Sequence, residues 1–403
     1  MDNEKKELDV GELNRELQTE LDKMWGSQEN EPQTLDKSHH RNHRKSHKNS
    51  KKEKKEKKEK GRLNPFKICI VILCMLILML GSVVSAFFYM RAKGERALQT
   101  EKVKVETTTP EDVEVEEDGK YIIYNGKRYC YNEDIINILC MGLDRSLNET
   151  SEDNIGANGQ ADVLVLAALD SQTGRFSLIN ISRETMVDVK KYNVNGQYLG
   201  TEEMQICLSY AYGDGKETSC LNTIDSVSRL MYGTPIHAYA AIDLDSISIL
   251  NDAVGGVTLT LMEDFSRWDS AMVKGATITL DGRQAYRYVR SRDVYNLESN
   301  NLRMDRQKQY LMAFLQKALA AAKEDMNVPL ALYQTASDYM VTDIGTSEVT
   351  YLASLVLEHG ISDGAMKTVP GEVTQGEVHA EFIPDDQGLY ELIIDVFYKE
   401  VTE

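Results

Sequence analysis

The stretch ADVLVLAALDSQTGRFSLINISRE (residues 161–184) decides the fold. Two apolar runs flank the turn-forming residues SQTG, and this pattern predicts two antiparallel strands joined as a hairpin. Polar residues hardly interrupt either run, so the hairpin is expected inside a buried sheet.

The surrounding sequence extends this prediction in both directions. IINILCMGLD (residues 135–144) is typical of another strand, and YIIYNGKRYCY (residues 121–131) predicts a hairpin with a type I′ turn at Asn125 and Gly126. Helical patterns follow in TIDSVSRLMYG, LDSISILNDAVGG, GRQAYRYVRSR and RMDRQKQYLMAFLQKALAAAK. Strands interspersed with helices predict one α/β domain.

An apolar run, FKICIVILCMLILMLGSVVSAFFYM, covers residues 66–90. As a helix it would be roughly 37 Å long, enough to cross a hydrocarbon core of roughly 30 Å with some tilt. A cleaved signal peptide would begin nearer the N-terminus and have a shorter apolar core. The run therefore predicts a single transmembrane helix.

Charge is distributed unevenly around this helix. The formal net charge is -18, yet the basic stretch RNHRKSHKNSKKEKKEKKEKGR precedes the apolar run. Such a tail either binds nucleic acid or marks the cytoplasmic side and contacts anionic lipid, and the absence of interleaved aromatic residues favours the second role. We expect a cytoplasmic basic tail (1–65), a transmembrane helix (66–90), a charged extracytoplasmic stalk (91–120) and an acidic extracytoplasmic domain (121–403, core 135–322) that does not bind nucleic acid.

Arginines concentrate in RYVRSRDVYNLESNNLRMDRQ (residues 287–307). Arg303, Arg306 and Gln307 share one side of a helix and can converge on one ligand. Guanidinium groups match phosphate oxygens and stay charged, although pairing with surface acids is a common alternative that contributes little. For Arg287 and Arg306, facing solvent is the alternative role.

Carboxylates occupy the ends of predicted strands. Asp144 follows one apolar strand and Asp162 begins the next, where two such groups can hold Mg²⁺ while a phosphate supplies further oxygens. Turn formation and strand capping are their alternative roles. Arg183 and Glu184 follow the neighbouring strand, so acids and arginines together predict a pyrophosphate site.

Seven blocks occur in an order that resembles the LytR-CpsA-Psr (LCP) family of bacterial envelope proteins. They are GLDRS, ADVLVLAALD, LINISRETMV, LSYAYGDG, IHAYAAIDLDSISILNDAVGGV, LDGRQAYRYVRSRD and LRMDRQ. The resemblance covers about residues 135–322. It implies an extracytoplasmic LCP-like domain with a central mixed β-sheet flanked by helices, and the Gram-positive type of cell envelope.

The resemblance also implies an activity. LCP enzymes are Mg²⁺-dependent phosphotransferases that move a glycopolymer, such as teichoic acid or capsule, to peptidoglycan. The glycopolymer comes from an undecaprenyl pyrophosphate carrier, which is a membrane lipid. By position, Asp144 and Asp162 correspond to the metal ligands. The pyrophosphate binders are then Arg183, Arg290, Arg292, Arg303 and Gln307. Apolar residues of the sheet and of the helix over residues 310–322 line either a lipid tunnel or an ordinary core.

Several positions depart from the family pattern. Gln160, Gln205, Cys207 and Asn300 stand where the family usually has an arginine, a lysine, an asparagine and an acid, and Glu184 replaces an aspartate. Because one cation and one acid are lost, the identity of the general base stays open. Glu184 is one candidate for this base, and Asp293 is a substitute candidate. The same departures support an alternative function, a non-catalytic polyprenyl-phosphate binding or regulatory protein.

Cysteines offer two possibilities outside the membrane. Cys207 and Cys220 are close enough in sequence to pair as a disulfide, or they are structural thiols. No C-x-x-C metal spacing occurs.

Overall fold

The structure of the protein is a computed structural model. It describes residues 65–100, 107–110, 113–117, 120–144, 156, 159–193, 195–291, 299–362, 364–376 and 379–401. The predicted cytoplasmic tail lies outside the described residues, apart from its last position.

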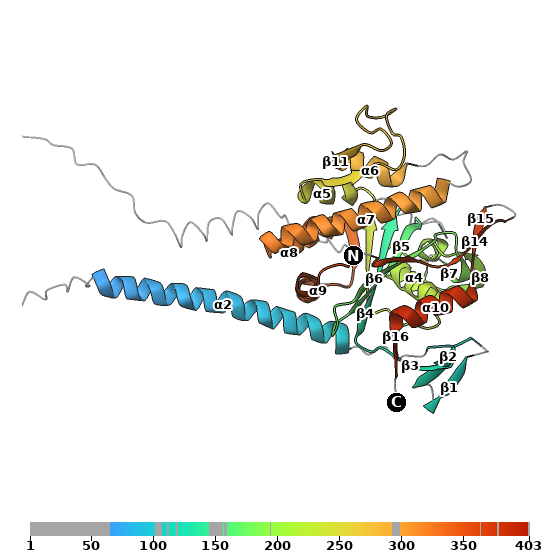
Figure 1. Ribbon diagram of the computed structural model, residues 1–403, viewed down its shortest axis with the longest axis horizontal. Helices are drawn as coiled ribbons and strands as arrows, with labels where there is room; N and C mark the ends of the chain where they lie inside the picture. The colour runs from blue at the N-terminus through green and yellow to red at the C-terminus, as the bar shows by residue number, and fades with distance from the viewer. Residues whose placement is uncertain are drawn as a thin grey trace, which may run out of the picture. The chain divides into compact units, whose positions relative to one another are not determined.

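The hairpin over residues 161–184 lies in the middle of a six-stranded sheet (Figure 1). In spatial order the strands are β12 (Met340–Thr342), β9 (Ala238–Asp243), β4 (Ile135–Leu143), β5 (Ala161–Asp170), β6 (Phe176–Ile181) and β13 (Met366–Thr368). β4, β5 and β6 pair antiparallel, whereas β9 and β13 join β4 and β6 in parallel. The predicted α/β fold with a central mixed sheet is therefore confirmed.

One face of this sheet is closely covered. Leu139, Leu164 and Ile179 are fully buried against helices α3 (Leu208–Ala211), α4 (Glu217–Leu230) and α10 (Asp386–Phe397). Side chains alternate across a strand, so their neighbours point to the opposite face. There Cys140, Val163 and Ala167 are only half-buried, because the helices on that side leave a cavity over the sheet.

Five helices belong to the second side of the molecule. They are α5 (Ser246–Ala253), α6 (Gly282–Arg290), α7 (Ser299–Glu324), α8 (Val328–Ala336) and α9 (Thr346–His359), with a short 3-10 turn η2 (Ser337–Tyr339) after α8. α6 begins with a capping box, in which the Asp281 carboxylate accepts from the Gln284 backbone N–H and the Gln284 side chain accepts from Asp281 N–H. This box fixes where the arginine-bearing helix starts.

Smaller sheets complete the fold. One of them consists of β1 (Glu114–Glu116), β2 (Tyr121–Tyr124), β3 (Lys127–Tyr131) and β16 (Tyr398–Glu400). Three two-stranded sheets are formed by β7 (Met186–Tyr192) with β8 (Tyr198–Gln205), by β10 (Val257–Thr260) with β11 (Thr277–Leu280), and by β14 (Gly371–Gln375) with β15 (Ala380–Pro384). The predicted turn between β2 and β3 is confirmed, since both Asn125 and Gly126 have positive φ, as a type I′ turn requires.

Helix α2 (Pro65–Thr100) contains the predicted membrane span but is longer than expected. The stretch Ile72–Gln99 is long and apolar enough to cross a membrane, and its apolar side chains are exposed in the absence of lipid. The predicted stalk over residues 91–120 differs in the structure, because residues 91–100 continue the helix and residues 114–116 join a sheet.

The last turns of α2 pack on α9. Leu98 is buried with Tyr351 and Leu355 of α9 and with Ile136 of β4. The side-chain amide of Gln99 donates to the hydroxyls of Ser171 and Tyr351, at 3.2 and 3.3 Å. The folded domain is therefore attached directly to helix α2.

Candidate active site

A carboxylate held by two arginines lies where the central sheet ends. Asp162 begins β5, Arg183 follows β6, and Arg303 reaches the same point from the first turns of α7. Arg183 Nη1 pairs with Asp162 Oδ1, and Arg303 Nη1 lies 3.4 Å from Asp162 Oδ2. The three side chains are only 9–18% exposed, so two guanidinium groups lie together in a largely buried place. Guanidinium groups held in this way can donate to the oxygens of a phosphate.

Gln160 joins the cluster to Asp144. Its side-chain oxygen accepts from Arg183 Nη2 at 2.9 Å, and its backbone N–H donates to Asp144 Oδ1 at 2.7 Å. The buried Arg183 Nε has no hydrogen-bond partner among the described residues. An unused guanidinium N–H beside two used ones is a donor that a phosphate oxygen can accept from.

Cys207 lies beside the same groups. Burial raises the pKa of the Cys207 thiol to about 12, so the thiol is neutral at physiological pH. The nearby guanidinium of Arg183 opposes this shift, and the carboxylates of Asp162, Glu184 and Asp144 add to it. Cys207 and Cys220 are both free thiols, so the disulfide alternative is wrong.

Gln307 connects the cluster to an apolar cavity. It lies one helical turn after Arg303 on α7, and its side-chain amide donates to the Val289 carbonyl at 3.2 Å. Gln307 and Val289 line a cavity of about 320 Å³ between the half-covered face of the sheet and helices α5 and α7. The other lining side chains are mainly apolar and include Val165, Leu311 and Phe314.

Arg306 does not converge with Arg303, and the alternative that it faces solvent is wrong. Its side chain is 3% exposed and forms an ion pair with Glu263 at 2.8 Å. Its guanidinium also donates to the Ser291 carbonyl and lies 5.0 Å from the ring centre of Phe265. Arg306 therefore fastens α7 to the end of α6 instead of facing the cluster.

The remaining predicted residues are spread more widely. Arg290 ends α6 with its guanidinium 5.2 Å from the ring centre of Tyr286. Glu184 is buried beside Arg183, and its backbone carbonyl accepts from Phe382 N–H. Arg292 and Asp293 lie outside the described residues. Asn300 lies in the first turn of α7.

The donors present suit Mg²⁺ in one respect. Mg²⁺ in phosphate chemistry is commonly held by one or two carboxylates, with substrate phosphates supplying other ligands. Asp144 and Asp162 stand at the ends of adjacent strands, and three or more acids, cysteines or histidines do not gather into a metal site anywhere in the described part of the chain. The donor set thus fits a metal that arrives with its phosphate substrate, not a preformed protein cage.

The sequence pattern of the LytR_cpsA_psr family matches residues 88–392, which include the cluster, the cavity and most of the fold. The chain belongs to this family.

Characterised relatives are transferases and a regulator. The chain is 25% identical over 225 residues to the polyisoprenyl-teichoic acid–peptidoglycan teichoic acid transferase TagU of Enterococcus faecalis, covering 55% of this chain and 66% of that protein. It is 27% identical over 186 residues to TagU of Oceanobacillus iheyensis, covering 46% and 52%. Biofilm regulatory protein A of Streptococcus mutans is 26% identical over 260 residues, covering 63% and 59%. The chain thus spans about half to two thirds of each relative.

Solved structures agree on the fold. The crystal structure of protein gbs0355 from Streptococcus agalactiae has a TM-score of 0.53 at 22% identity, covering 65% of this chain and 86% of that one. The crystal structure of TagV from B. subtilis has a TM-score of 0.50 at 21% identity, covering 65% and 96%.

Proposed function

We propose that this LCP protein is a membrane-anchored phosphotransferase that moves a glycopolymer from an undecaprenyl pyrophosphate carrier to peptidoglycan. The observation that carries the proposal is that the Asp162, Arg183 and Arg303 cluster neighbours an apolar cavity, which is lined by Val163, the residue after Asp162, and by Gln307, one helical turn after Arg303. A lipid pyrophosphate has the same two parts, an anion joined to a hydrocarbon tail. The names of the TagU relatives, which transfer teichoic acid to peptidoglycan, agree with this chemistry.

The arginines account for most of the chemistry that this chain supplies. In the transfer step, an acceptor hydroxyl attacks the phosphorus that bears the polymer, a new phosphate ester forms, and the pyrophosphate bond breaks. Polyprenyl phosphate leaves with the electron pair of that bond. Arg183 and Arg303 would then turn from Asp162 toward the phosphate oxygens and stabilise the charge on the leaving group.

Asp144 and Asp162 would hold Mg²⁺ when the substrate brings it. The metal would add positive charge that stabilises the developing negative charge of the leaving phosphate. Removal of the acceptor's proton requires a base beside the attacked phosphorus, and the first candidate is Glu184, the buried residue that follows Arg183 in the sequence. Asp293 is the second candidate for this base.

Orientation follows from charge. The basic stretch before α2 would stay in the cytoplasm, which places residues 91–403 outside. Peptidoglycan and the lipid-linked polymer would then meet this domain on the outer side of the membrane.

The test uses the full-length protein in lipid vesicles with an undecaprenyl-pyrophosphate-linked glycan and a peptidoglycan fragment. The assay measures both the glycan attached to the fragment and the undecaprenyl phosphate released, with Mg²⁺ or with excess chelator. We expect both products in equal amounts, and their loss in Arg303→Ala. Arg175→Ala is the matched control, since Arg175 is an exposed arginine that pairs with Asp395 and is not a member of the cluster.

The alternative function has its own signature in the same assay. Gln160 stands where the family usually has an arginine, and its side-chain oxygen accepts a hydrogen bond from Arg183. The site therefore has one positive charge fewer than an arginine at this position would give it. A protein that only binds the carrier would retain undecaprenyl phosphate in native mass spectrometry and release no product. That result would overturn the transferase proposal.

A further inference from the structure

Helix α6 carries a line of arginines on its outer side. Arg283, Arg287 and Arg290 are spaced at i, i+4 and i+7, which places them along one face of the helix. Ala285 and Tyr288 lie on the opposite face and are buried in the core that α6 shares with β10 and β11. From Arg283 to Arg290 the line is about 10 Å long.

Another arginine extends this line onto the segment between β10 and β11. The Arg287 guanidinium carbon lies 5.8 Å from the ring centre of Trp268, and the Arg267 guanidinium carbon lies 3.6 Å from it. The buried ring of Phe265 stacks on Trp268, with 5.8 Å between the ring centres. The indole is therefore anchored to the core, and its contact with Arg267 restricts the rotamers of that side chain. We call Arg267, Arg283 and Arg287 the outer arginines.

The acids of this region are engaged elsewhere. Glu263 forms its ion pair with the buried Arg306. The carboxylates of Asp264 and Asp269 accept hydrogen bonds from neighbouring backbone N–H groups and polar side chains, and Asp269 lies near Arg283 without pairing with it. Among the described residues, none of the outer arginines forms an ion pair. Their N–H donors are available to a ligand, in a chain whose net charge is -18.

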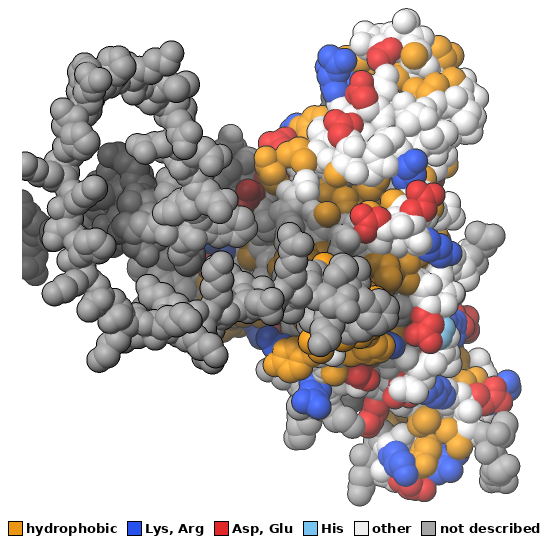
Figure 2. Space-filling view, turned by 90° about the vertical axis from the view of Figure 1, so that its left-hand side faces the viewer, with side chains coloured by type: hydrophobic (Ala, Val, Ile, Leu, Met, Phe, Trp, Pro, Cys, Tyr) orange, Lys and Arg blue, Asp and Glu red, His pale blue; other side chains and the backbone are white. Residues whose placement is uncertain are grey.

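This arrangement differs from that on other parts of the surface. On the face of the molecule shown in Figure 2, basic and acidic side chains lie next to one another. Exposed pairs of this kind contribute little and leave no net charge for a ligand. The outer arginines therefore form a local positive surface, and such a surface attracts an anionic ligand.

The outer arginines lead to the phosphate-binding cluster. α6 ends at Arg290, and there the Gln307 side chain of α7 donates to the Val289 carbonyl at 3.2 Å. Gln307 lies one helical turn after Arg303, which belongs to the cluster. A chain that is attached to a pyrophosphate at the cluster can therefore continue past the end of α6 toward Arg267.

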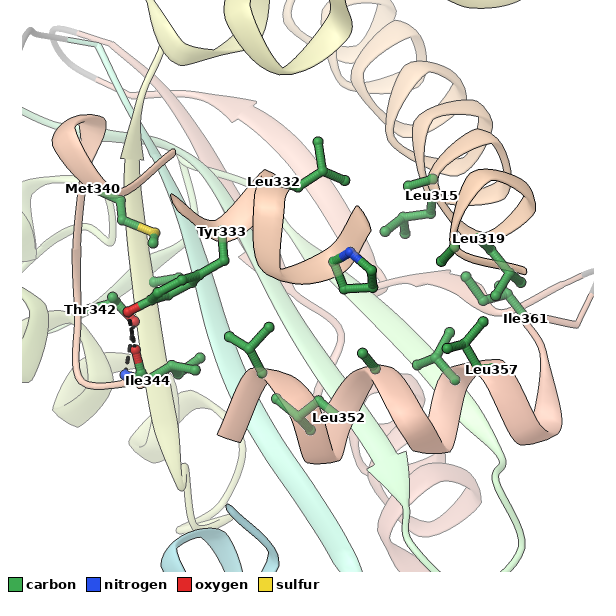
Figure 3. Close-up of a pocket in the computed structure, with 17 residues that line it drawn as sticks. Leu315, Leu319, Leu332, Tyr333, Met340, Thr342, Ile344, Leu352, Leu357 and Ile361 are labelled. Carbon is green, nitrogen blue, oxygen red and sulfur yellow. Dashed lines mark hydrogen bonds between the residues drawn. The ribbon is translucent and has the colours of Figure 1, made fainter. Parts of the chain in front are cut away.

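Helix α7 is held at both ends, which fixes the position of the outer arginines relative to the cluster. Its first turns contact the end of α6 through the hydrogen bond of Gln307. Further along, Leu315 and Leu319 line an apolar cavity together with Leu332 of α8 and Leu357 of α9, and Leu319 points toward Leu357 (Figure 3). Substrate contacts at the polar end of α7 are thus built on a packed helix.

We propose that the outer arginines bind phosphodiester groups within the glycopolymer chain, apart from the pyrophosphate that reacts. This inference rests on the function proposed above and adds to it a chemical class, a polymer with repeating negative charges. Guanidinium groups donate two parallel hydrogen bonds to a phosphate, so a row of them suits charges that recur along a chain. A neutral polysaccharide would gain nothing from this row. The outer arginines select the polymer, whereas the cluster carries out the transfer.

Trp268 provides a reporter of binding at this surface. The chain contains two tryptophans, so Trp25→Phe leaves Trp268 as the single one. The full-length Trp25→Phe protein in lipid vesicles is titrated with a soluble glycerol phosphate oligomer, with a neutral dextran of similar length or with inorganic phosphate. We expect a saturable change of tryptophan emission with the oligomer and none with dextran, because a phosphate that binds Arg267 alters its contact with the indole.

Arg283→Gln and Arg287→Gln test the arginines themselves in this Trp25→Phe background. Each should weaken binding of the oligomer about tenfold, the loss expected for one charge-assisted hydrogen bond in a partly exposed place. Arg229→Gln is the matched control, because Arg229 is an exposed arginine of α4 that pairs with Asp225. Unchanged affinity in both variants would overturn the proposal.

The other ligands give further outcomes that would overturn the proposal. Dextran that binds as tightly as the oligomer would show that charge is not recognised. Inorganic phosphate that binds as tightly would show a site for one phosphate and not for a polymer. A response to a peptidoglycan fragment in place of the oligomer would assign this surface to the acceptor.

A transfer assay separates this inference from the proposed function. The donors are an undecaprenyl-pyrophosphate-linked disaccharide and the same disaccharide extended by glycerol phosphate units. Arg287→Gln should raise KM for the extended donor about tenfold and leave the short donor unchanged. Equal effects on both donors would overturn the inference and leave the proposed function intact. If neither donor reacts with the unchanged protein, the proposed function fails, and the fluorescence titration still decides whether the outer arginines bind the polymer.

Discussion

Replacing Gly94 with alanine should detach α2 from α9. A Cβ at this position would overlap the carbonyl oxygen of Ser347, at the start of α9, and the neighbouring backbone atoms, which cannot rotate away. Gly81 lies in the same helix, and a Cβ there would meet nothing within 4 Å. Gly81→Ala is therefore the matched control, with the same change in helix propensity, about 1 kcal/mol.

The free-energy cost of detaching α2 follows from the contacts that are lost when α2 and α9 separate. Leu98 is 4% exposed, and returning it to solvent costs about 2 kcal/mol. Loss of the two hydrogen bonds of Gln99 adds about 1 kcal/mol, since both are partly exposed to water. The docked state should therefore lose about 3 kcal/mol relative to the detached state, or roughly 150-fold in its equilibrium constant, because the gain in helix propensity is the same in both states and cancels.

Hydrogen–deuterium exchange of the full-length protein in lipid nanodiscs measures this loss. Backbone amides of α9 should exchange up to roughly 150-fold faster in Gly94→Ala, because they open when α2 leaves. Amides of β4 and β5 at the centre of the sheet should be unchanged. Equal exchange in the Gly94→Ala and Gly81→Ala proteins would refute the packing argument.

Further outcomes are expected at Arg303, Gln160 and Cys207. Arg303→Lys should transfer polymer about 100-fold more slowly than the unchanged protein in the release assay, because one ammonium cannot replace a guanidinium fork, and normal turnover would contradict its role. Gln160→Arg should tighten binding of undecaprenyl phosphate in a vesicle titration, since it adds a cation beside Arg183, and weaker binding would show that the glutamine is needed. The raised pKa of Cys207, about 12, makes its thiol slow to alkylate with iodoacetamide at pH 8 in the native state. The neutral thiol also contributes to the free energy of unfolding. This contribution is complete below the pKa of the thiol in the unfolded chain and declines as the pH rises from about 9 to about 12. Cys207→Ser should flatten that decline in thermal unfolding, and an unchanged decline would exclude the thiol as its cause.

Sequence patterns predicted the centre of the fold because its elements are defined by local signals. Apolar runs bounded by turn residues mark β4, β5 and β6, and the apolar face of α7 follows from its three- and four-residue spacing. The order of elements then brought Asp162, Arg183 and Arg303 to one end of the sheet, although they are far apart in the chain.

Long-range partners explain what the sequence could not predict. Arg303 and Arg306 share one side of α7 by spacing, yet Arg306 pairs with Glu263, more than forty residues earlier. Its burial between α7 and the β10–β11 segment depends on a fold that no local pattern defines. Residues 91–100 look solvated because they are charged, but Gly94 and Leu98 form a narrow stripe that fits α9.

Under the proposed function, the docking of α2 would also limit how far the domain reaches into the cell wall. A flexible linker of 30 residues would let the domain wander over roughly 30 Å from its anchor. Here a continuous helix leads from the apolar stretch of α2 into the domain and packs against it. If α2 spans the membrane as proposed, the arginine cluster would be held at one height above the bilayer. Under the proposed function, acceptor strands would then have to come to this height themselves, which would restrict attachment to the peptidoglycan layer nearest the membrane.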